Sequence, residues 1–439
     1  MKKAFILSLT LLAVAFSATA RKSSALTYAA PESAGLDSEY LNYTIDSIAT
    51  ASIAARCFPG CQILVARHGK IVFHKSYGHH TYDAKRDVEN DHLYDMASCT
   101  KVMAATICLM RLVEQGKLDL DAPLSTYLEE FRGSNKADLT LRECLTHQSG
   151  LRNEGASRLF IDKKTKQLRS DLFSTVQSEE FPQPFCDGIY IHKDNRERML
   201  DLIVKQQPRA KKFHYSCFNF HLTAFLVERL TGRNYEEYLY EEFYKPLGAK
   251  DAMYNPTRKY STAQIVPTEI DRRFRKKLAQ GYVHDEAAAS MGGVSGNAGL
   301  FANSASLAPI LQMLVNGGEY NGTRYFKQKT IREWTSCQYP DNGNHRAIGF
   351  DRRRLNDTLT LAERTTKPYY YAPSASKSSF GHSGFTGTMV WADPAEDLIF
   401  VFLSNRVHPS RNNKVYFEIN PRTKCHEAAY EAIRRFNKR

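Results

Sequence analysis

The chain has 439 residues, of which 42% are hydrophobic and 11% aromatic, and this composition excludes an intrinsically disordered protein. Lys and Arg outnumber Asp and Glu by 60 to 47, giving a formal net charge of +13. The basic residues stand in short, scattered groups without interleaved aromatic residues, so we expect solvated surfaces and no nucleic-acid partner.

The first twenty residues have the layout of a secretory signal. Two lysines precede an apolar run at 4–16, and small residues end the segment at Ala20. We therefore predict a signal peptide over 1–20 with cleavage near Ala20, a leader over 21–36, and a periplasmic or secreted protein. The apolar run is short for a membrane span and no other segment reaches that length, so stable membrane insertion is not expected.

Periodicity along the rest of the chain predicts helices separated by two hairpins. The turn of the first hairpin contains Gly69, which tolerates the positive φ of a tight turn. The predicted strands are 62–66, 71–77, 386–392 and 398–404, and the predicted helices are 38–55, 100–115, 219–231, 235–244, 305–315 and 426–436.

Strand-rich segments near both ends of the chain indicate an α+β fold. We expect one antiparallel β-sheet flanked by helices, built from 37–120 together with 300–439. A mostly helical domain, 121–299, would be inserted between them. Such a two-part arrangement suits the length, because single cores stop growing efficiently near 250 to 300 residues.

The cysteines give no metal signature. Nine are present, so disulfides are possible in an exported chain, and the odd number leaves at least one thiol without an intramolecular partner. Cys57 and Cys61 lack the second Cys or His pair of a zinc site. We expect no metal and no other cofactor.

A Ser-x-x-Lys tetrad at the start of a predicted helix is the first sign of chemistry. Ser98 and Lys101 are three residues apart, so they share a helix face and the ammonium can reach the hydroxyl. A neutral serine needs such a proton acceptor to act as a nucleophile. Taken alone, such a tetrad is more often an N-cap serine followed by a solvated lysine, because Ser-x-x-Lys occurs by chance in many chains.

The segments around this tetrad resemble the serine β-lactamase and penicillin-binding-protein superfamily, specifically its class C β-lactamase-related branch. The resemblance rests on ordered matches and extends from about 59 to 409. The matching segments are the nucleophile region at 96–124, a Leu-Thr-Leu-Arg to Gly-Leu segment at 139–151, a Tyr-containing element at 213–217, and a His-x-Gly form of the Lys-Thr-Gly motif at 381–387.

This resemblance implies a role for each of several residues. Tyr215 would be the partner base that shares a proton with Lys101 and later activates water. His382, Ser383 and Gly384 would lie on an edge strand facing Ser98, and His382 either binds substrate or only packs. The backbone N–H groups of Phe385 and Ser98 would form the oxyanion hole. His147 is expected to cap or pack, and Cys99 to be a buried filler.

One position departs from the family pattern. Cys217 stands where the family usually has Asn or Asp, a side chain that bonds the lysine or the substrate amide. Because cysteine is a weak hydrogen-bond partner, this residue weakens the expectation of amide or β-lactam recognition while leaving the nucleophile unaffected.

Further segments indicate a subgroup within the class C β-lactamase-related branch. Residues 281–286, 292–301 and 405–409 look like exported hydrolases associated with bacterial N-acetylglucosaminidases, some of which cleave the muramoyl-alanine amide of cell-wall fragments. Asn297 replaces a histidine common in that group. The leading hypothesis is a serine hydrolase that forms an acyl-enzyme through Ser98 on a small-molecule or muropeptide substrate. The alternatives are a carboxylesterase and an inactive protein that binds cell-wall peptide.

Overall fold

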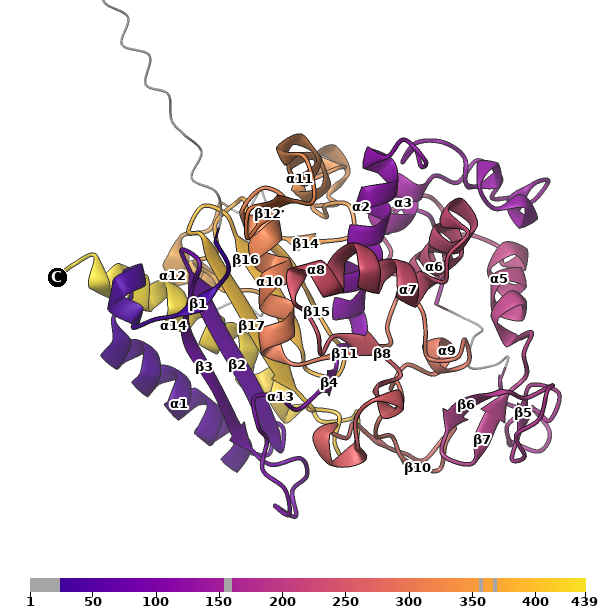
Figure 1. Cartoon of the computed structure of the whole chain (residues 1–439), viewed down its shortest axis with the longest axis horizontal. Helices are drawn as coiled ribbons and strands as arrows, with labels where there is room; N and C mark the ends of the chain where they lie inside the picture. The colour runs from indigo at the N-terminus through magenta and orange to yellow at the C-terminus, as the bar shows by residue number, and fades with distance from the viewer. Residues whose placement is uncertain (1–23, 154–159, 355–357, 366–368) are drawn as a thin grey trace, which may run out of the picture.

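The computed structural model describes residues 24–153, 160–354, 358–365 and 369–439 (Figure 1). The predicted signal peptide at 1–20 lies outside these ranges. Within the predicted leader, β1 (Thr27–Tyr28) pairs in parallel with the strand at Lys70–Gly78. No helix of the described residues is both long and apolar enough to cross a membrane.

The largest sheet in the described part of the chain joins strands from both ends of the sequence. Every neighbouring pair is antiparallel except β1 with β3. The strand order is β1, β3 (Lys70–Gly78), β2 (Gly60–Arg67), β17 (Leu398–Ser404), β16 (Met389–Asp393), β15 (Phe380–Ser383) and β14 (Asp351–Arg352). This confirms the predicted α+β fold with an antiparallel-rich sheet flanked by helices.

The two faces of the sheet belong to two separate hydrophobic cores. In β17, Phe400 and Phe402 pack into one core while Ile399 and Val401 pack into the other, as the period of two along a strand requires. Helices α1 (Ser38–Ala54) and α14 (Pro421–Phe436) cover the first face. Helix α10 (Ser304–Val315) lies across the second face, between the sheet and the rest of the molecule (Figure 1).

The middle of the chain combines helices with short strands. Two small sheets of three strands occur among the described residues: β4 (Tyr94–Asp95), β11 (Leu300–Ala302) and β8 (Met253–Tyr254), and β5 (Phe173–Ser174), β7 (Ile189–Ile191) and β6 (Gln183–Cys186). Two-stranded pairs are β9 (Ile270–Asp271) with β10 (Lys277–Leu278), and β12 (Glu319–Tyr320) with β13 (Thr323–Arg324). The remaining α-helices are α2 (Thr106–Glu114), α3 (Leu141–Leu145), α5 (Asn195–Lys205), α6 (Phe218–Thr231), α7 (Tyr235–Leu239), α8 (Lys245–Leu247), α9 (Glu286–Ala289), α11 (Gln328–Thr335), α12 (Leu361–Thr365) and α13 (Val415–Ile419).

Some predicted elements differ locally from the observed ones. The helix expected at 235–244 is α-helical to Leu239 and π-helical from Tyr240 to Tyr244, and the helix expected at 426–436 begins at Pro421. The strand expected at 386–392 begins at Met389, because the residues before it form a turn. The helix expected at 100–115 is preceded by a 3-10 turn at Ala97–Cys99 and starts as a π-helical turn at Lys101–Ala105. A π-helical turn inside a helix is rare and is often found at functional sites.

All nine cysteines lie in the described residues and all are free thiols. Burial raises the pKa of the Cys99 thiol to about 12. Its Sγ lies 3.4 Å from the carbonyl oxygen of His382, so Cys99 fills space between the nucleophile segment and β15, as predicted. None of the nine forms a disulfide, although the sequence left that possibility open.

Candidate active site

Ser98 lies at a sharp bend between β4 and the π-helical turn. The residue before it, Ala97, has φ +45°, in the left-handed region that side chains rarely adopt. The Ala97 N–H donates to Oδ1 of Asp95 at 2.8 Å, which holds this conformation. The bend leaves the Ser98 side chain partly exposed while its neighbours are buried.

Lys101 is fully buried and reaches the Ser98 hydroxyl. Its Nζ donates to Ser98 Oγ at 3.0 Å and to the backbone oxygen of Asn297 at 2.8 Å. Cys217 Sγ lies 3.8 Å from the same nitrogen. The lysine is therefore oriented by a backbone carbonyl on one side and the nucleophile on the other, which excludes the solvated-lysine interpretation.

Tyr215 is the third member of the hydrogen-bonded group that contains Ser98 and Lys101. Its hydroxyl donates to Ser98 Oγ at 3.0 Å. The His147 ring lies 4.3 Å from the Tyr215 ring, measured between centroids, and His147 Nδ1 accepts the Ser216 N–H at 3.2 Å. His147 therefore packs against the tyrosine and fixes the backbone next to it, in agreement with the packing role expected from the sequence.

Protonation of the group follows from its burial. Burial alone would lower the pKa of the Lys101 ammonium, but Cys217 and Tyr215, whose ionised forms would pair with it, raise that pKa overall. Burial raises the pKa of the Tyr215 phenol, which the Lys101 ammonium opposes in part. The resting pair therefore holds both of its protons at neutral pH.

A turn between β15 and β16 is tied to the nucleophile bend by two hydrogen bonds. Thr388 Oγ1 donates to Met96 O at 2.9 Å, and Thr386 Oγ1 donates to Asp95 O at 2.8 Å. Within the turn, Gly384 N–H donates to Thr388 O at 2.8 Å. A Cβ on Gly384 would lie 2.6 Å from Met96 O, so only glycine permits this approach. The structure thus places Ser383, Gly384 and Phe385 beside the Ser98 segment.

The His382–Gly384 motif was expected on an edge strand, but β15 is not the outermost strand along its whole length. β14 pairs with Phe380 and Gly381, so β15 is not the outermost strand there. In the described residues β14 does not continue beside His382 and Ser383, because it has only two residues. Phe385 is 49% exposed and lies between the His284 ring and the Arg406 guanidinium.

His382 is neutral in this setting. Burial lowers its pKa to about 4, although Asp351, 3.9 Å from Nδ1, opposes the shift. Its Nδ1 lies 2.8 Å from the carbonyl oxygen of Ser383 and therefore carries the proton. The buried Nε2 has no hydrogen-bond partner among the described residues and is left as an acceptor.

Cys217 lies beside Lys101 in the position that the resemblance assigns to an amide or carboxylate side chain. Burial raises the pKa of its thiol, so the sulfur is protonated and neutral. The Cys217 N–H donates to Oδ1 of Asn153 at 2.5 Å, which fixes the start of α6. Asn297 is also buried, and both polar atoms of its side chain lack a hydrogen-bond partner within the described residues.

Sequence reasoning missed Asp95. Its Oδ1 holds Ala97, and its Oδ2 accepts the His284 N–H at 2.6 Å. In the sequence, Asp95 is only an acidic residue two positions before Ala97 and Ser98, and this pattern is too common to indicate a role. Its role becomes visible when 95, 97 and 284 are brought together in space.

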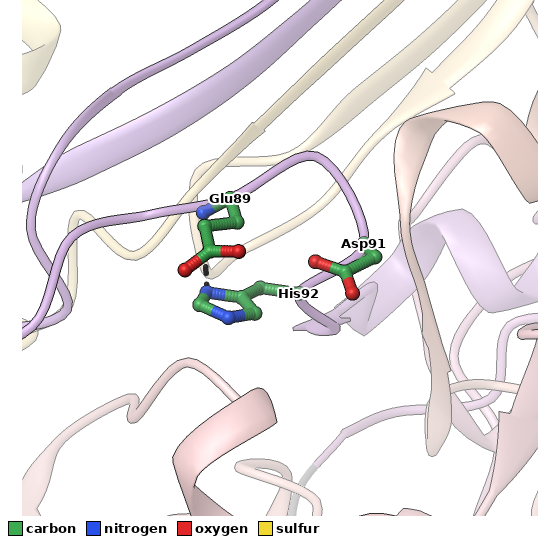
Figure 2. A group of neighbouring side chains, drawn as sticks. All are labelled: Glu89, Asp91 and His92. Carbon is green, nitrogen blue, oxygen red and sulfur yellow. Dashed lines mark hydrogen bonds between the residues drawn. The ribbon is translucent and has the colours of Figure 1, made fainter.

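One potential metal-binding group occurs among the described residues: Glu89, Asp91 and His92, whose ligand atoms lie within 4.8 Å of one another (Figure 2). His92 Nδ1 already accepts the Glu89 N–H at 3.2 Å and faces His80 Nε2 at 2.9 Å. Both carboxylates are exposed. The group forms a hydrogen-bonded turn of its own, and the hydrogen bonds to Ser98 Oγ among the described residues come from Lys101 and Tyr215 instead.

Comparison with known proteins assigns the family. The family model described as Beta-lactamase matches residues 45–419. The chain belongs to the Beta-lactamase family. It is accordingly a serine hydrolase, with a fold related to penicillin-binding proteins and class C β-lactamases.

Relatives of this Beta-lactamase family member carry several names. A "Putative D-alanyl-D-alanine carboxypeptidase" of Escherichia coli O157:H7 is 29% identical, with 94% of each chain covered. An N-acetylmuramyl-L-alanine amidase of Bacillus subtilis is 30% identical over 85% of this chain and 83% of its own length. Among solved structures, EstCE1, a hydrolase with promiscuous acyltransferase activity, has a TM-score of 0.63 at 15% identity, covering 89% of this chain and 99% of its own.

Proposed function

We propose that this protein is an exported serine hydrolase that forms an acyl-enzyme through Ser98, and that its substrate is a peptidoglycan-derived amide or peptide. One observation carries the proposal. Ser98 Oγ accepts hydrogen bonds from Lys101 Nζ at 3.0 Å and from the Tyr215 hydroxyl at 3.0 Å. A serine nucleophile needs a group within hydrogen-bond reach that can take its proton, and Lys101 and Tyr215 can do so once one of them has lost its own proton.

The reaction proceeds in two halves. Ser98 Oγ bonds to the acyl carbon and its proton passes to the Lys101–Tyr215 pair, in the fraction of molecules where that pair has lost one proton. The pair then gives this proton to the leaving amine. Water then gives a proton to the same pair and attacks the ester carbonyl, and the pair returns this proton to Ser98 Oγ as the bond between Oγ and the acyl carbon breaks and the acid leaves.

The oxyanion is held by backbone N–H groups. The turn that carries Phe385 is fixed to the Ser98 segment through Thr386 and Thr388. A preorganised pair of N–H groups from Ser98 and Phe385 would stabilise the tetrahedral intermediate by several kcal/mol.

His382 is neutral and buried, and its Nε2 is an unused acceptor. The His382 ring lies 6.2 Å from the Tyr215 ring, measured between centroids.

Acyl-enzyme formation is tested by labelling with a fluorophosphonate and with a fluorescent penicillin. The wild type should acquire one label, located on Ser98 by peptide mass spectrometry, and Ser98→Ala should acquire none. Equal labelling of both proteins would overturn the proposal. Incubation with purified sacculus and defined muropeptides, followed by mass spectrometry, then identifies the bond that the enzyme cleaves.

Export is tested separately. Amino-terminal sequencing of the mature chain should show cleavage near Ala20.

A carboxylesterase is the second candidate, and Cys217 is the observation that favours it. The thiol 3.8 Å from Lys101 Nζ supplies no amide group to bind a peptide bond. An ester has no N–H to be recognised and needs less leaving-group protonation. Turnover of p-nitrophenyl esters without any turnover of muropeptides would decide for the esterase.

A further inference from the structure

The ring of Phe385, whose N–H belongs to the proposed oxyanion hole, packs against two buried side chains. The His284 ring is stacked on it, with 5.6 Å between the centroids and 27° between the planes. The guanidinium carbon of Arg406 lies 4.6 Å from the Phe385 centroid. Both neighbours are buried, whereas Phe385 itself is half-exposed. The position of the Phe385 ring is therefore set by side chains that have little freedom to move.

A buried carboxylate fixes the orientation of the His284 ring. Its Nε2 lies 2.9 Å from Oε2 of Glu269. Although burial would raise the pKa of Glu269, hydrogen bonds from His284 and Arg411 lower that pKa to about 2, so the carboxylate is ionised and accepts the imidazole N–H. Arg411 Nε donates to the same oxygen at 2.7 Å. A buried polar network whose members are paired in this way holds its side chains in one arrangement.

The backbone of His284 is bound to the nucleophile segment. Oδ2 of Asp95 accepts the His284 N–H at 2.6 Å. Oδ1 of the same carboxylate accepts the N–H of Ala97 at 2.8 Å, immediately before Ser98. His284 therefore joins the two segments that carry the oxyanion donors. Its backbone is held with the Ser98 bend, and its ring holds Phe385.

We infer that His284 is a positioning residue for the oxyanion hole, which sets the place of the Phe385 N–H relative to the Ser98 N–H. The inference rests on the proposed function and deepens it. Because a side chain and its own N–H are joined to the same Cα, holding the Phe385 ring restricts the direction of that N–H. Oxyanion donors act at about 2.7 to 3.1 Å from the developing charge, so a small displacement lowers the rate while ground-state binding is kept.

An ester and a thionoester with the same acyl group separate this role from a purely structural one. The thionoester carries sulfur in place of the carbonyl oxygen, and sulfur is a weak acceptor, so the oxyanion hole accelerates its acylation much less. His284→Ala removes the ring and keeps the N–H that Asp95 binds. It should lower kcat for the ester about tenfold with little change in KM and in the thionoester rate, so the ester-to-thionoester ratio falls about tenfold.

Three further variants test the geometry. Phe385→Ala, at a half-exposed position, should lower the ratio as His284→Ala does. His284→Phe keeps an aromatic ring against Phe385 and should restore most of the wild-type ratio. Phe417→Ala is the matched control, because Phe417 is the other half-exposed ring beside Arg406, 4.7 Å from its guanidinium carbon. This variant should keep the ratio of the wild type.

The two proposals fail differently. If the wild type is not labelled on Ser98 by a fluorophosphonate, the proposed function is wrong. If it is labelled, but Phe385→Ala and His284→Ala keep the wild-type ratio or slow both substrates equally, His284 does not position the oxyanion hole. A fall in Phe417→Ala as large as in His284→Ala would assign the effect to Arg406 and would also overturn the inference. Circular dichroism checks that each variant is folded, and Phe385→Ala decides if His284→Ala is not.

Discussion

The N–H of Ala97 donates to Oδ1 of Asp95 at 2.8 Å and holds Ala97 at φ +45°, immediately before Ser98. The left-handed conformation costs a non-glycine residue about 1 to 2 kcal/mol. Asp95 is buried and binds a second N–H, that of His284, so the carboxylate joins the nucleophile bend to the segment before α9.

Asp95→Ala is therefore expected to impair both stability and acylation. It leaves two N–H groups without their acceptor, at about 1 to 3 kcal/mol each, so the free energy of unfolding should fall by roughly 2 to 6 kcal/mol. Urea denaturation measures this loss, and stopped-flow labelling of Ser98 should show at least tenfold slower acylation. A matched control is Ala97→Gly, which permits positive φ and should leave the protein as stable as the wild type or slightly more stable. Unchanged stability in Asp95→Ala would contradict this role.

Tyr215→Phe should slow acylation by about 10² to 10⁴, the usual contribution of a general acid or base. The phenyl ring keeps the contact with the His147 ring, so the thermal midpoint should change little. Rapid-quench labelling with a fluorophosphonate measures the rate. A Tyr215→Phe enzyme as fast as the wild type would assign the proton transfer to Lys101 alone.

The rate of acylation should rise with pH through neutrality and into the alkaline range. Both the Lys101 and the Tyr215 pKa are raised, so the form of the pair that can accept the Ser98 proton is a minor species at pH 7. Its fraction grows tenfold per pH unit until the lower of the two pKa values is reached. A pH profile of single-turnover rates measures this; a plateau already at pH 6 would show that the pair rests in its deprotonated form.

Cys217→Asn should raise the ratio of amide to ester turnover, by roughly tenfold. The amide side chain would place a donor and an acceptor beside Lys101 Nζ, where the thiol provides neither at full strength. The comparison is made on an ester and an amide with the same acyl group, with Cys217→Ser as the control that changes polarity without adding an amide. A fall in the ratio would mean that the thiol itself contributes to amide recognition.

The protein should lose stability as the pH falls below about 6.5, in part through His426. This side chain is fully buried against Phe400, and burial lowers its pKa to about 3. Because the folded pKa lies below the ordinary value, the unfolded chain binds the proton more readily, and the free energy of unfolding decreases between pH 6.5 and 3. His426→Gln should reduce this dependence. Guanidinium unfolding of the wild type and the variant at a series of pH values tests this.

Local patterns predicted much of the fold. The first hairpin is observed at Gly60–Arg67 and Lys70–Gly78, with the expected turn glycine at φ +71°. Its alternating residues and its glycine are local signals, and so are the periodic helices. The strand order could not be read in this way, since β2 finds its partner β17 more than 300 residues later.

The residues of the candidate site could be predicted where they belong to short sequence motifs. Ser98, Lys101 and Tyr215 do meet within hydrogen-bond distance. Asp95 escaped notice because its significance depends on a partner distant in sequence, the His284 N–H. An aspartate is not unusual in its own segment, so no local pattern distinguished it.

The pairing of β2 with β17, from Arg67 with Leu398 to Cys61 with Ser404, also sets an order of events during synthesis. A ribosome releases the first hairpin while its neighbouring strand is still untranslated, and the turn that braces the Ser98 bend emerges just before that strand. Long-range pairing of this kind delays folding until the distant segment is available. Nascent chains therefore carry Ser98 before the turn that braces it and the strand that pairs with β2 have been made.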